Sequence, residues 1–73
     1  MKTVEEIRYL FSGKTQPQFA EEIGLSLRAY CQRIKGQQPD WRISELIKAS
    51  RYNEGCVAVE LDGVKYDITI KEE

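Results

Sequence analysis

The stretch of residues 15–36, TQPQFAEEIGLSLRAYCQRIKG, decides the fold because it has the pattern of two short helices joined by a tight turn. Gly24 lies at the turn, where a glycine permits the positive φ that ends a helix. Each half carries apolar residues at helical spacing, so each helix has a face to bury. These residues are Phe19, Ala20 and Ile23 in the first half and Tyr30 and Ile34 in the second.

A helix is also predicted before this stretch, over residues 4–12. Thr3 and Glu6 have the spacing of a capping box, in which the hydroxyl accepts from an early backbone N–H and the carboxylate reaches back. Gly13 is placed to end the helix in a left-handed conformation. The buried stripe of this helix is expected to consist of Val4, Ile7, Leu10 and Phe11.

The two helices of the central stretch have capping residues of their own. Thr15 and Gln18 repeat the capping box, and the helix that they begin is expected to end at Ile23. Ser26 is a favourable N-cap for the next helix, which is predicted over residues 27–35.

A fourth helix is predicted after a polar connection over residues 36–39. Asp40 is expected to be its N-cap, and the helix should fade near Ser50 and Arg51. Its buried stripe is expected to be Ile43, Leu46 and Ile47, with Trp41 covering one end of the core.

Residues 56–71 have the alternating pattern of a β-hairpin. Asp62 and Gly63 lie between the two alternating runs and are typical of a two-residue turn. This turn sets the register, in which Glu60 faces Lys65 on one side of the hairpin. Because an isolated hairpin is marginal in water, its apolar side must pack on the helices or on another chain. That side consists of Val57, Val59, Leu61, Val64, Tyr66 and Ile68, which are candidate contacts with a dimer partner or another protein.

The chain is predicted to form one domain. Its 73 residues fit a mainly α domain (1–73), with a four-helix part over residues 3–51 and a hairpin of two antiparallel strands over 56–71. An apolar share of 41% and a charged share of 32% are ordinary for a globular domain. No apolar run approaches the length of a membrane span, and Glu5 and Glu6 interrupt any secretory leader. We therefore expect a cytoplasmic protein without a membrane partner.

Histidine is absent from the chain, which removes the usual general base and the usual zinc ligands. Cys31 and Cys56 are expected to be reduced thiols, because there are only two and Cys31 lies on a predicted helix. No pattern places two acidic groups around a pocket. We expect no enzymatic activity, no metal site and no cofactor.

The charge of the chain is unevenly distributed. In total, 11 basic residues stand against 12 acidic ones, which is unusual for a protein that binds nucleic acid. Residues 1–36 nevertheless carry six basic and four acidic side chains, a net of +2, whereas residues 37–73 carry five and eight, a net of −3. A positive helical surface is therefore expected, with the acidic hairpin facing away from it.

Several features of the helical part occur together in one known family. They are a small residue where two helices cross, a glycine in the turn between them and an apolar residue that locks the pair. The matching positions are Thr15, Gln16, Ala20, Gly24, Leu25, Ser26 and Tyr30. With these features, residues 3–51 resemble the DNA-binding domain of phage Cro and repressor proteins, the XRE-type helix-turn-helix family. The resemblance implies a lambda-repressor-like fold whose third helix, residues 27–35, reads the major groove of DNA.

The resemblance also implies which side chains meet DNA. Base edges are read from the first exposed turns of the third helix, which indicates Leu27, Arg28 and Gln32. Arg28 could bind guanine, Gln32 could bind adenine, and Leu27 could contact a thymine methyl group. Each phosphate candidate has an alternative role as a helix cap or as part of a solvated face. The phosphate candidates are Gln16, Lys14, Ser26, Arg33, Lys35 and Arg42.

Two functions are compatible with these residues. The first is a sequence-specific transcriptional regulator that binds a double-stranded DNA operator as a homodimer joined through the hairpin. The second keeps the helix-turn-helix fold but acts on another protein, as an antirepressor, a modulator of a repressor or an antitoxin. Leu27 favours the second function, because a polar residue is usual at an exposed reading position.

Overall fold

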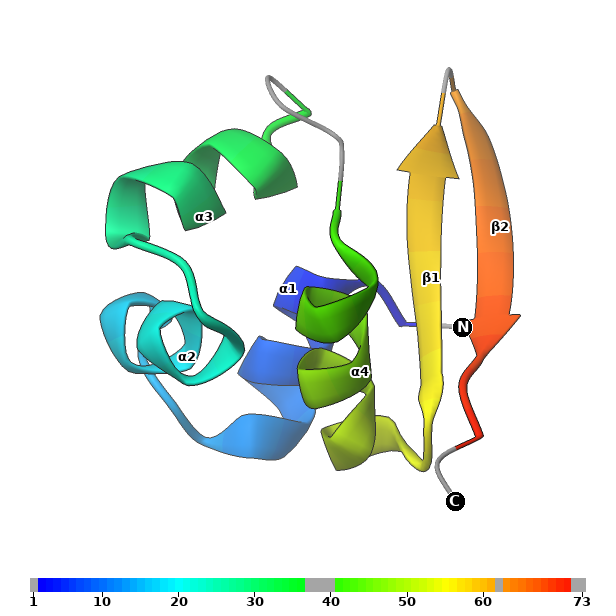
Figure 1. Cartoon of the computed structure of the whole chain (residues 1–73), viewed down its shortest axis with the longest axis horizontal. Helices are drawn as coiled ribbons and strands as arrows, with labels where there is room; N and C mark the ends of the chain where they lie inside the picture. Colours follow the sequence, from blue (N-terminus) through cyan, green and yellow to red (C-terminus); the bar gives the residue numbers. More distant parts are fainter. Residues whose placement is uncertain (1, 37–40, 62, 72–73) are drawn as a thin grey trace.

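The structure is a computed structural model that describes residues 2–36, 41–61 and 63–71. It is a mainly helical domain with a C-terminal antiparallel hairpin, as expected from the sequence. Figure 1 shows the helices gathered on one side of the hairpin, with α4 beside β1 and β2 at the periphery. In chain order the elements are α1 (Val4–Ile7), a π-helix (Arg8–Ser12), α2 (Gln16–Ile23), α3 (Leu27–Ile34), α4 (Ile43–Ser50), a 3-10 turn (Arg51–Asn53), β1 (Cys56–Leu61) and β2 (Val64–Thr69).

The first helical segment begins and ends as predicted but changes its winding midway. Thr3 and Glu6 form the expected capping box, and Gly13 at φ 68° follows the last helical residue. From Arg8 onward the segment is a π-helix, which holds more residues in each turn than an α-helix. Leu10 and Phe11 are therefore turned away from the stripe of Val4 and Ile7, and the prediction that they are buried is wrong.

The α2–turn–α3 unit has the caps that the sequence predicts. The Thr15 hydroxyl accepts from the Gln18 N–H, and the Ser26 hydroxyl accepts from the Ala29 N–H at 3.2 Å. Gly24 has φ 90° and ends α2, and the next residue, Leu25, donates its N–H to the Ala20 carbonyl at 2.8 Å. The left-handed turn therefore joins two helices through only three residues, which keeps their relative direction well defined.

The start of α4 differs from the prediction. The helix begins at Ile43 with Arg42 as its N-cap, and the Arg42 N–H donates to a Glu45 carboxylate oxygen at 2.9 Å. The predicted cap Asp40, like the rest of the connection 37–40, lies outside the described residues. Ile43 is 67% exposed, so the prediction that it is buried is also wrong. The residues that α4 buries are Glu45, Leu46, Ala49 and Ser50, a stripe centred roughly a quarter turn away from Ile43.

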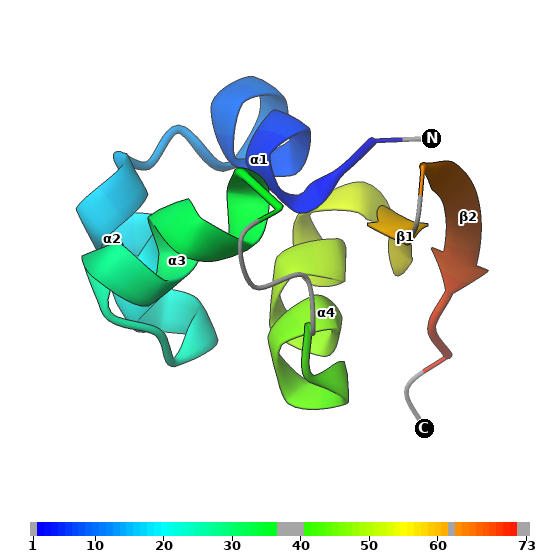
Figure 2. The same cartoon turned by 90° about the horizontal axis from the view of Figure 1, so that it is seen from above.

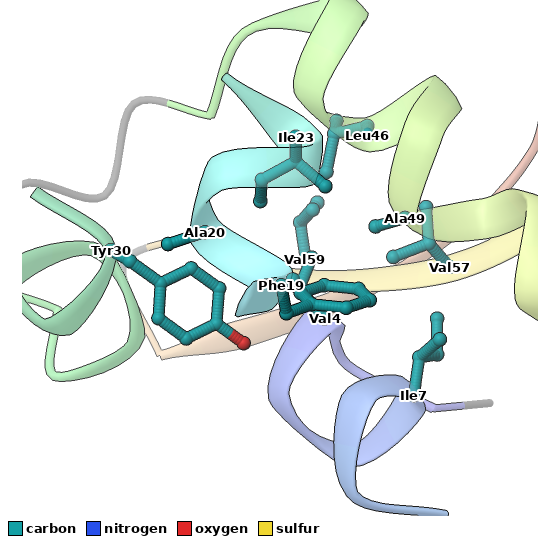
Figure 3. Packing of buried hydrophobic residues seen from close by; sticks show 10 residues of the cluster. All are labelled: Val4, Ile7, Phe19, Ala20, Ile23, Tyr30, Leu46, Ala49, Val57 and Val59. Carbon is teal, nitrogen blue, oxygen red and sulfur yellow. The ribbon is translucent and has the colours of Figure 1, made fainter. Parts of the chain in front are cut away.

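The core lies between the helices and β1. Figure 3 shows the Phe19 ring close to side chains from three other elements, and its centroid is 6.0 Å from that of Tyr30. Trp41 packs edge-on against Tyr30 at 6.3 Å, so it covers one end of the core as expected. The buried apolar cluster consists of Val4, Ile7, Phe19, Ala20, Ile23, Tyr30, Leu46, Ala49, Val57 and Val59.

The hairpin has the predicted register, with Glu60 opposite Lys65 and Val59 opposite Tyr66. Of its turn, Asp62 lies outside the described residues, whereas Gly63 has φ 78°. β1 packs on α1 and α4. The apolar side of this strand therefore packs on the helices of its own chain. No helix within the described ranges is long and apolar enough to cross a membrane.

The contacts of the hairpin with its own helices correct the list of candidate partner contacts. Val57 and Val59 are buried in the core of this chain and are therefore not available to a partner in this fold. Ile68 is half-buried against the same core, while Val64 and Tyr66 remain exposed. The side chain of Leu61 lies outside the described residues. The sequence shows which hairpin residues share a side, but not which of the two strands the helices cover.

Candidate nucleic-acid interface

Two of the predicted base contacts, Arg28 and Gln32, lie on the outer face of α3, and Leu27 is the first residue of the helix, three residues before Tyr30. Leu27 is 43% exposed, Arg28 is exposed and Gln32 is half-buried. Arg28 and Gln32 are four residues apart and so lie one above the other on the helix. Tyr30, on the opposite face, is fully buried and fixes the helix to the core. The start of α3 therefore presents an apolar, a cationic and an amide side chain to solvent.

Arg28 is the cation best placed to reach a ligand from this face. Within the described part of the chain its guanidinium has no hydrogen bond or ion pair. It lies in the first turn of α3, where the positive end of the helix dipole makes a cation slightly unfavourable. Nothing in the described fold therefore accounts for a cation at this position.

Glu5 joins α1 to both helices of the α2–turn–α3 unit. Its carboxylate accepts from the Gln16 amide nitrogen at 2.7 Å, from the Tyr30 hydroxyl at 2.9 Å and from the Arg8 guanidinium. Burial alone would raise the pKa of Glu5, but the hydrogen bonds from Arg8, Gln16 and Tyr30 outweigh it and hold that pKa below its ordinary value. Burial, together with the bond to Glu5, raises the pKa of Tyr30.

The Glu5 network holds Gln16 at the N-terminal end of α2. The amide nitrogen of Gln16 has two protons, and one of them is donated to Glu5. Its second N–H remains for another acceptor, such as a phosphate oxygen. Sequence reasoning missed Glu5 and Arg8 because Tyr30 is 25 residues from Glu5 and no local pattern connects them.

The other predicted phosphate contacts differ in how accessible they are. Lys35 and Arg42 are exposed at the ends of α3 and α4. Lys14 is half-buried and its ammonium lies 3.5 Å from a Glu22 carboxylate oxygen, while the Ser26 hydroxyl is occupied as the cap of α3. These four residues and Gln16 lie at or near the ends of the helices.

Arg33 is the one phosphate candidate that the structure removes. Its guanidinium is ion-paired with Glu45 and lies 5.6 Å from the centre of the Trp41 ring, and the side chain is only 11% exposed. Arg33 follows Tyr30 by three residues and therefore shares the inward face of α3. The expectation that it binds phosphate is corrected, because its charge is used to join α3 to α4.

The α2–turn–α3 unit is distant from β2, which carries one basic and one acidic side chain. In both Figure 1 and Figure 2 these helices lie at one end of the molecule and β2 lies at the other.

Among the described residues, no group of three or more potential ligand side chains could hold a metal ion. Comparisons with protein-family models, curated proteins and solved structures found no significant match. The resemblance to Cro and repressor proteins therefore depends on the residues of this chain alone.

Proposed function

We propose that the protein is a sequence-specific, DNA-binding transcriptional regulator of the Cro or repressor kind. It acts in the cytoplasm as a homodimer and reads the major groove of an operator with α3. The observation that carries the proposal is the exposed surface of α3, where Leu27 and Arg28 lie in the first turn and Gln32 lies one turn further along, while the buried Tyr30 packs the helix on the core.

Each of these side chains suits a different base edge. The Arg28 guanidinium can donate two parallel hydrogen bonds to O6 and N7 of guanine, and the Gln32 amide can pair with N6 and N7 of adenine. Leu27 can pack on the methyl group of thymine. A site that contains these three bases within a few base pairs is therefore the expected half-site.

Gln16, Lys35 and Arg42 would position the protein on the phosphate backbone. Gln16 is the most constrained of them, because Glu5 holds its amide while leaving one N–H for a phosphate oxygen. Few cations are available for each chain, so one subunit should bind weakly and two subunits on adjacent half-sites should bind much more tightly.

Selection from a randomised duplex pool, followed by titration of the selected duplex at several salt concentrations, tests the proposal. The logarithm of the binding constant should fall linearly with the logarithm of salt concentration, and Lys35→Ala or Arg42→Ala should each reduce that slope by about 1. Lys71→Ala, which removes a charge beyond β2, is the matched control and should leave the slope unchanged. No binding at low salt, or a slope near zero, would contradict the proposal.

A second function is favoured by one observation, the exposed apolar residues. Leu27 is exposed at the start of α3, and Tyr9, Leu10 and Phe11 are exposed on the π-helix. A protein partner, such as a repressor, could cover Leu27 in the way that a thymine methyl group would.

Leu27→Asp separates the two functions when it is compared with Arg28→Ala. If the protein acts on a protein partner, Leu27→Asp should abolish capture of a stoichiometric partner and Arg28→Ala should not. If it acts on DNA, a purified protein should bind the selected duplex without any partner, and Arg28→Ala should weaken that binding.

A further inference from the structure

The carboxylate of Glu5 has both of its oxygen atoms occupied. Its Oε1 accepts from the Tyr30 hydroxyl at 2.9 Å and from Arg8 Nε, and its Oε2 accepts from the Gln16 amide nitrogen at 2.7 Å. A second guanidinium nitrogen of Arg8 also donates to Oε2, at 3.3 Å. The carboxylate is therefore fixed by Tyr30 and Arg8 and is not free to follow the Gln16 side chain.

The bond to Glu5 fixes which end of the Gln16 amide is available to a ligand. An ionised carboxylate only accepts hydrogen bonds, so the amide must turn its nitrogen, and not its oxygen, toward Glu5. The second N–H of the same nitrogen then points away from the carboxylate. A phosphate is also an acceptor only and needs that N–H. Without Glu5, rotation about the last side-chain bond would offer the amide oxygen to a phosphate as readily as the nitrogen.

The N-terminal end of α2 leaves few other donors for a phosphate. The second residue of the helix is Pro17, which has no backbone N–H, and the Gln18 N–H is donated to the Thr15 hydroxyl at 3.4 Å. The Phe19 N–H is donated to the Thr15 carbonyl at 2.9 Å. Within the described residues, the backbone N–H of Gln16 is thus the one donor of this turn without a protein partner. The Gln16 side chain therefore supplies the further donor that a phosphate contact at this place needs.

Arg8 balances the charge of Glu5 beside this donor. Its guanidinium donates to both carboxylate oxygens, and its third nitrogen donates to the Lys14 carbonyl at 2.9 Å. The Arg8 side chain is only 15% exposed. Arg8 is therefore occupied within the protein, and the ion pair can hold the Gln16 amide without presenting a net negative charge to a phosphate.

We propose that Glu5 is a positioning residue for DNA binding, which orients the Gln16 amide toward a backbone phosphate of the operator. This inference rests on the proposed function and adds to it a residue that does not itself touch DNA. The order that Glu5 imposes on the Gln16 side chain exists before DNA arrives, so the loss of side-chain freedom does not weaken the binding. Because Tyr30 donates to the same carboxylate, the phosphate donor and the buried side of α3 are held at one point.

The proposal predicts the opposite sign from simple electrostatics. Removing an acidic side chain generally favours the binding of a protein to a polyanion. Glu5→Met removes the carboxylate but leaves an unbranched side chain that cannot orient an amide, and it should weaken binding to the selected duplex by about fivefold. Glu21→Met, an equal charge change at an exposed position of α2, is the matched control and should not weaken the binding.

A double-mutant cycle with Gln16 separates positioning from a general effect on the fold. Gln16→Ala should weaken binding by about tenfold, and Glu5→Met/Gln16→Ala should be no weaker than Gln16→Ala alone, because Glu5 then has no amide to orient. Thr3→Ala, which weakens the cap of the helix that carries Glu5, is the structural control. It should lower the melting temperature and change the binding by the same factor with and without Gln16.

Nuclear magnetic resonance of the free protein tests the contact between Glu5 and Gln16 without DNA. The side-chain amide signals of Gln16, assigned by their absence in Gln16→Ala, should move toward those of exposed glutamines in Glu5→Met and stay in place in Glu21→Met. Unchanged amide signals in Glu5→Met, or losses of affinity that multiply in the double variant, would overturn the positioning role and leave DNA binding in place. A wild-type chain that binds no duplex would overturn the proposed function and the positioning role with it.

Discussion

At the scale of single residues, one carboxylate connects the first three helices. Glu5 accepts hydrogen bonds from Arg8, Gln16 and Tyr30, and Arg8 also donates to the Lys14 carbonyl at 2.9 Å. The donors come from the π-helix, α2 and α3, so the network spans the segments on either side of the loop before α2. Through it, the position of α3 on the core and the direction of the Gln16 amide depend on the same charged group.

Glu5→Gln is expected to change the pH dependence of stability. The pKa of Glu5 in the folded protein is below the ordinary value of 4.5, so its contribution is fully present above that value and is lost as the pH falls through the lower folded pKa. Urea unfolding at a series of pH values from neutral to acidic should show a shallower loss of stability for Glu5→Gln than for the wild type. Glu21→Gln, on an exposed carboxylate of α2, is the control. Identical acid slopes for the wild type and Glu5→Gln would contradict this role.

The ion pair of Arg33 and Glu45 is expected to be structural. Arg33→Met leaves the buried carboxylate of Glu45 with the Arg42 N–H but without its ion-pair partner, which should lower the free energy of unfolding by about 3 kcal/mol. The double variant Arg33→Met/Glu45→Leu removes both charges and should recover much of that loss, as measured by urea unfolding. Equal stability of Arg33→Met and the wild type would contradict a structural role for this ion pair.

At the scale of helices and strands, local signals in the sequence predict the elements well. Capping residues at Thr3, Thr15 and Ser26 begin helices where expected, and the two strands have the predicted register. The failures concern which way a side chain faces. Periodicity assumes α-helical winding, so it could not foresee that the π-helix turns Leu10 and Phe11 outward. It also could not foresee that Glu45, paired with Arg33, lies on the buried face of α4 while Ile43 lies outside it.

The part of the candidate site that lies on one helix could be predicted, whereas the part that depends on contacts between helices could not. Leu27, Arg28 and Gln32 are adjacent on one helix, so helical geometry alone brings them together. Arg33 lies on the same helix, but its role depends on Glu45, which is 12 residues away and on another helix. Pairings between distant segments leave no periodic trace in a single sequence.

Two glycines are expected to tolerate alanine very differently. Gly24 and Gly55 both have positive φ, at 90° and 81°, so alanine is strained at either position. A Cβ at Gly24 would meet only the end of the flexible Lys48 side chain at 4.0 Å, whereas one at Gly55 would lie 2.5 Å from the Ile70 carbonyl oxygen. Gly24→Ala should therefore cost about 1 to 2 kcal/mol, and Gly55→Ala about 3 kcal/mol or more. Thermal or urea unfolding of the two variants gives the comparison, and equal losses would contradict it.

At the scale of the whole molecule, the α2–turn–α3 unit is separated from the outer strand of the hairpin. The α2–turn–α3 unit lies at one end, and β2 lies at the other. A protein with a net charge of −1 can therefore present a cation such as Arg28, which is exposed on α3, at the end away from β2.

The most direct test of the account compares Arg28→Ala with Arg28→Lys on two duplexes, the selected one and a scrambled one of equal length. If Arg28 reads a base edge through two hydrogen bonds, both variants should lose about 1 to 3 kcal/mol of the preference for the selected duplex, because lysine keeps the charge but not the planar fork. Binding to the scrambled duplex should change little for Arg28→Lys. An unchanged preference in both variants would contradict the claim that the outer face of α3 reads DNA.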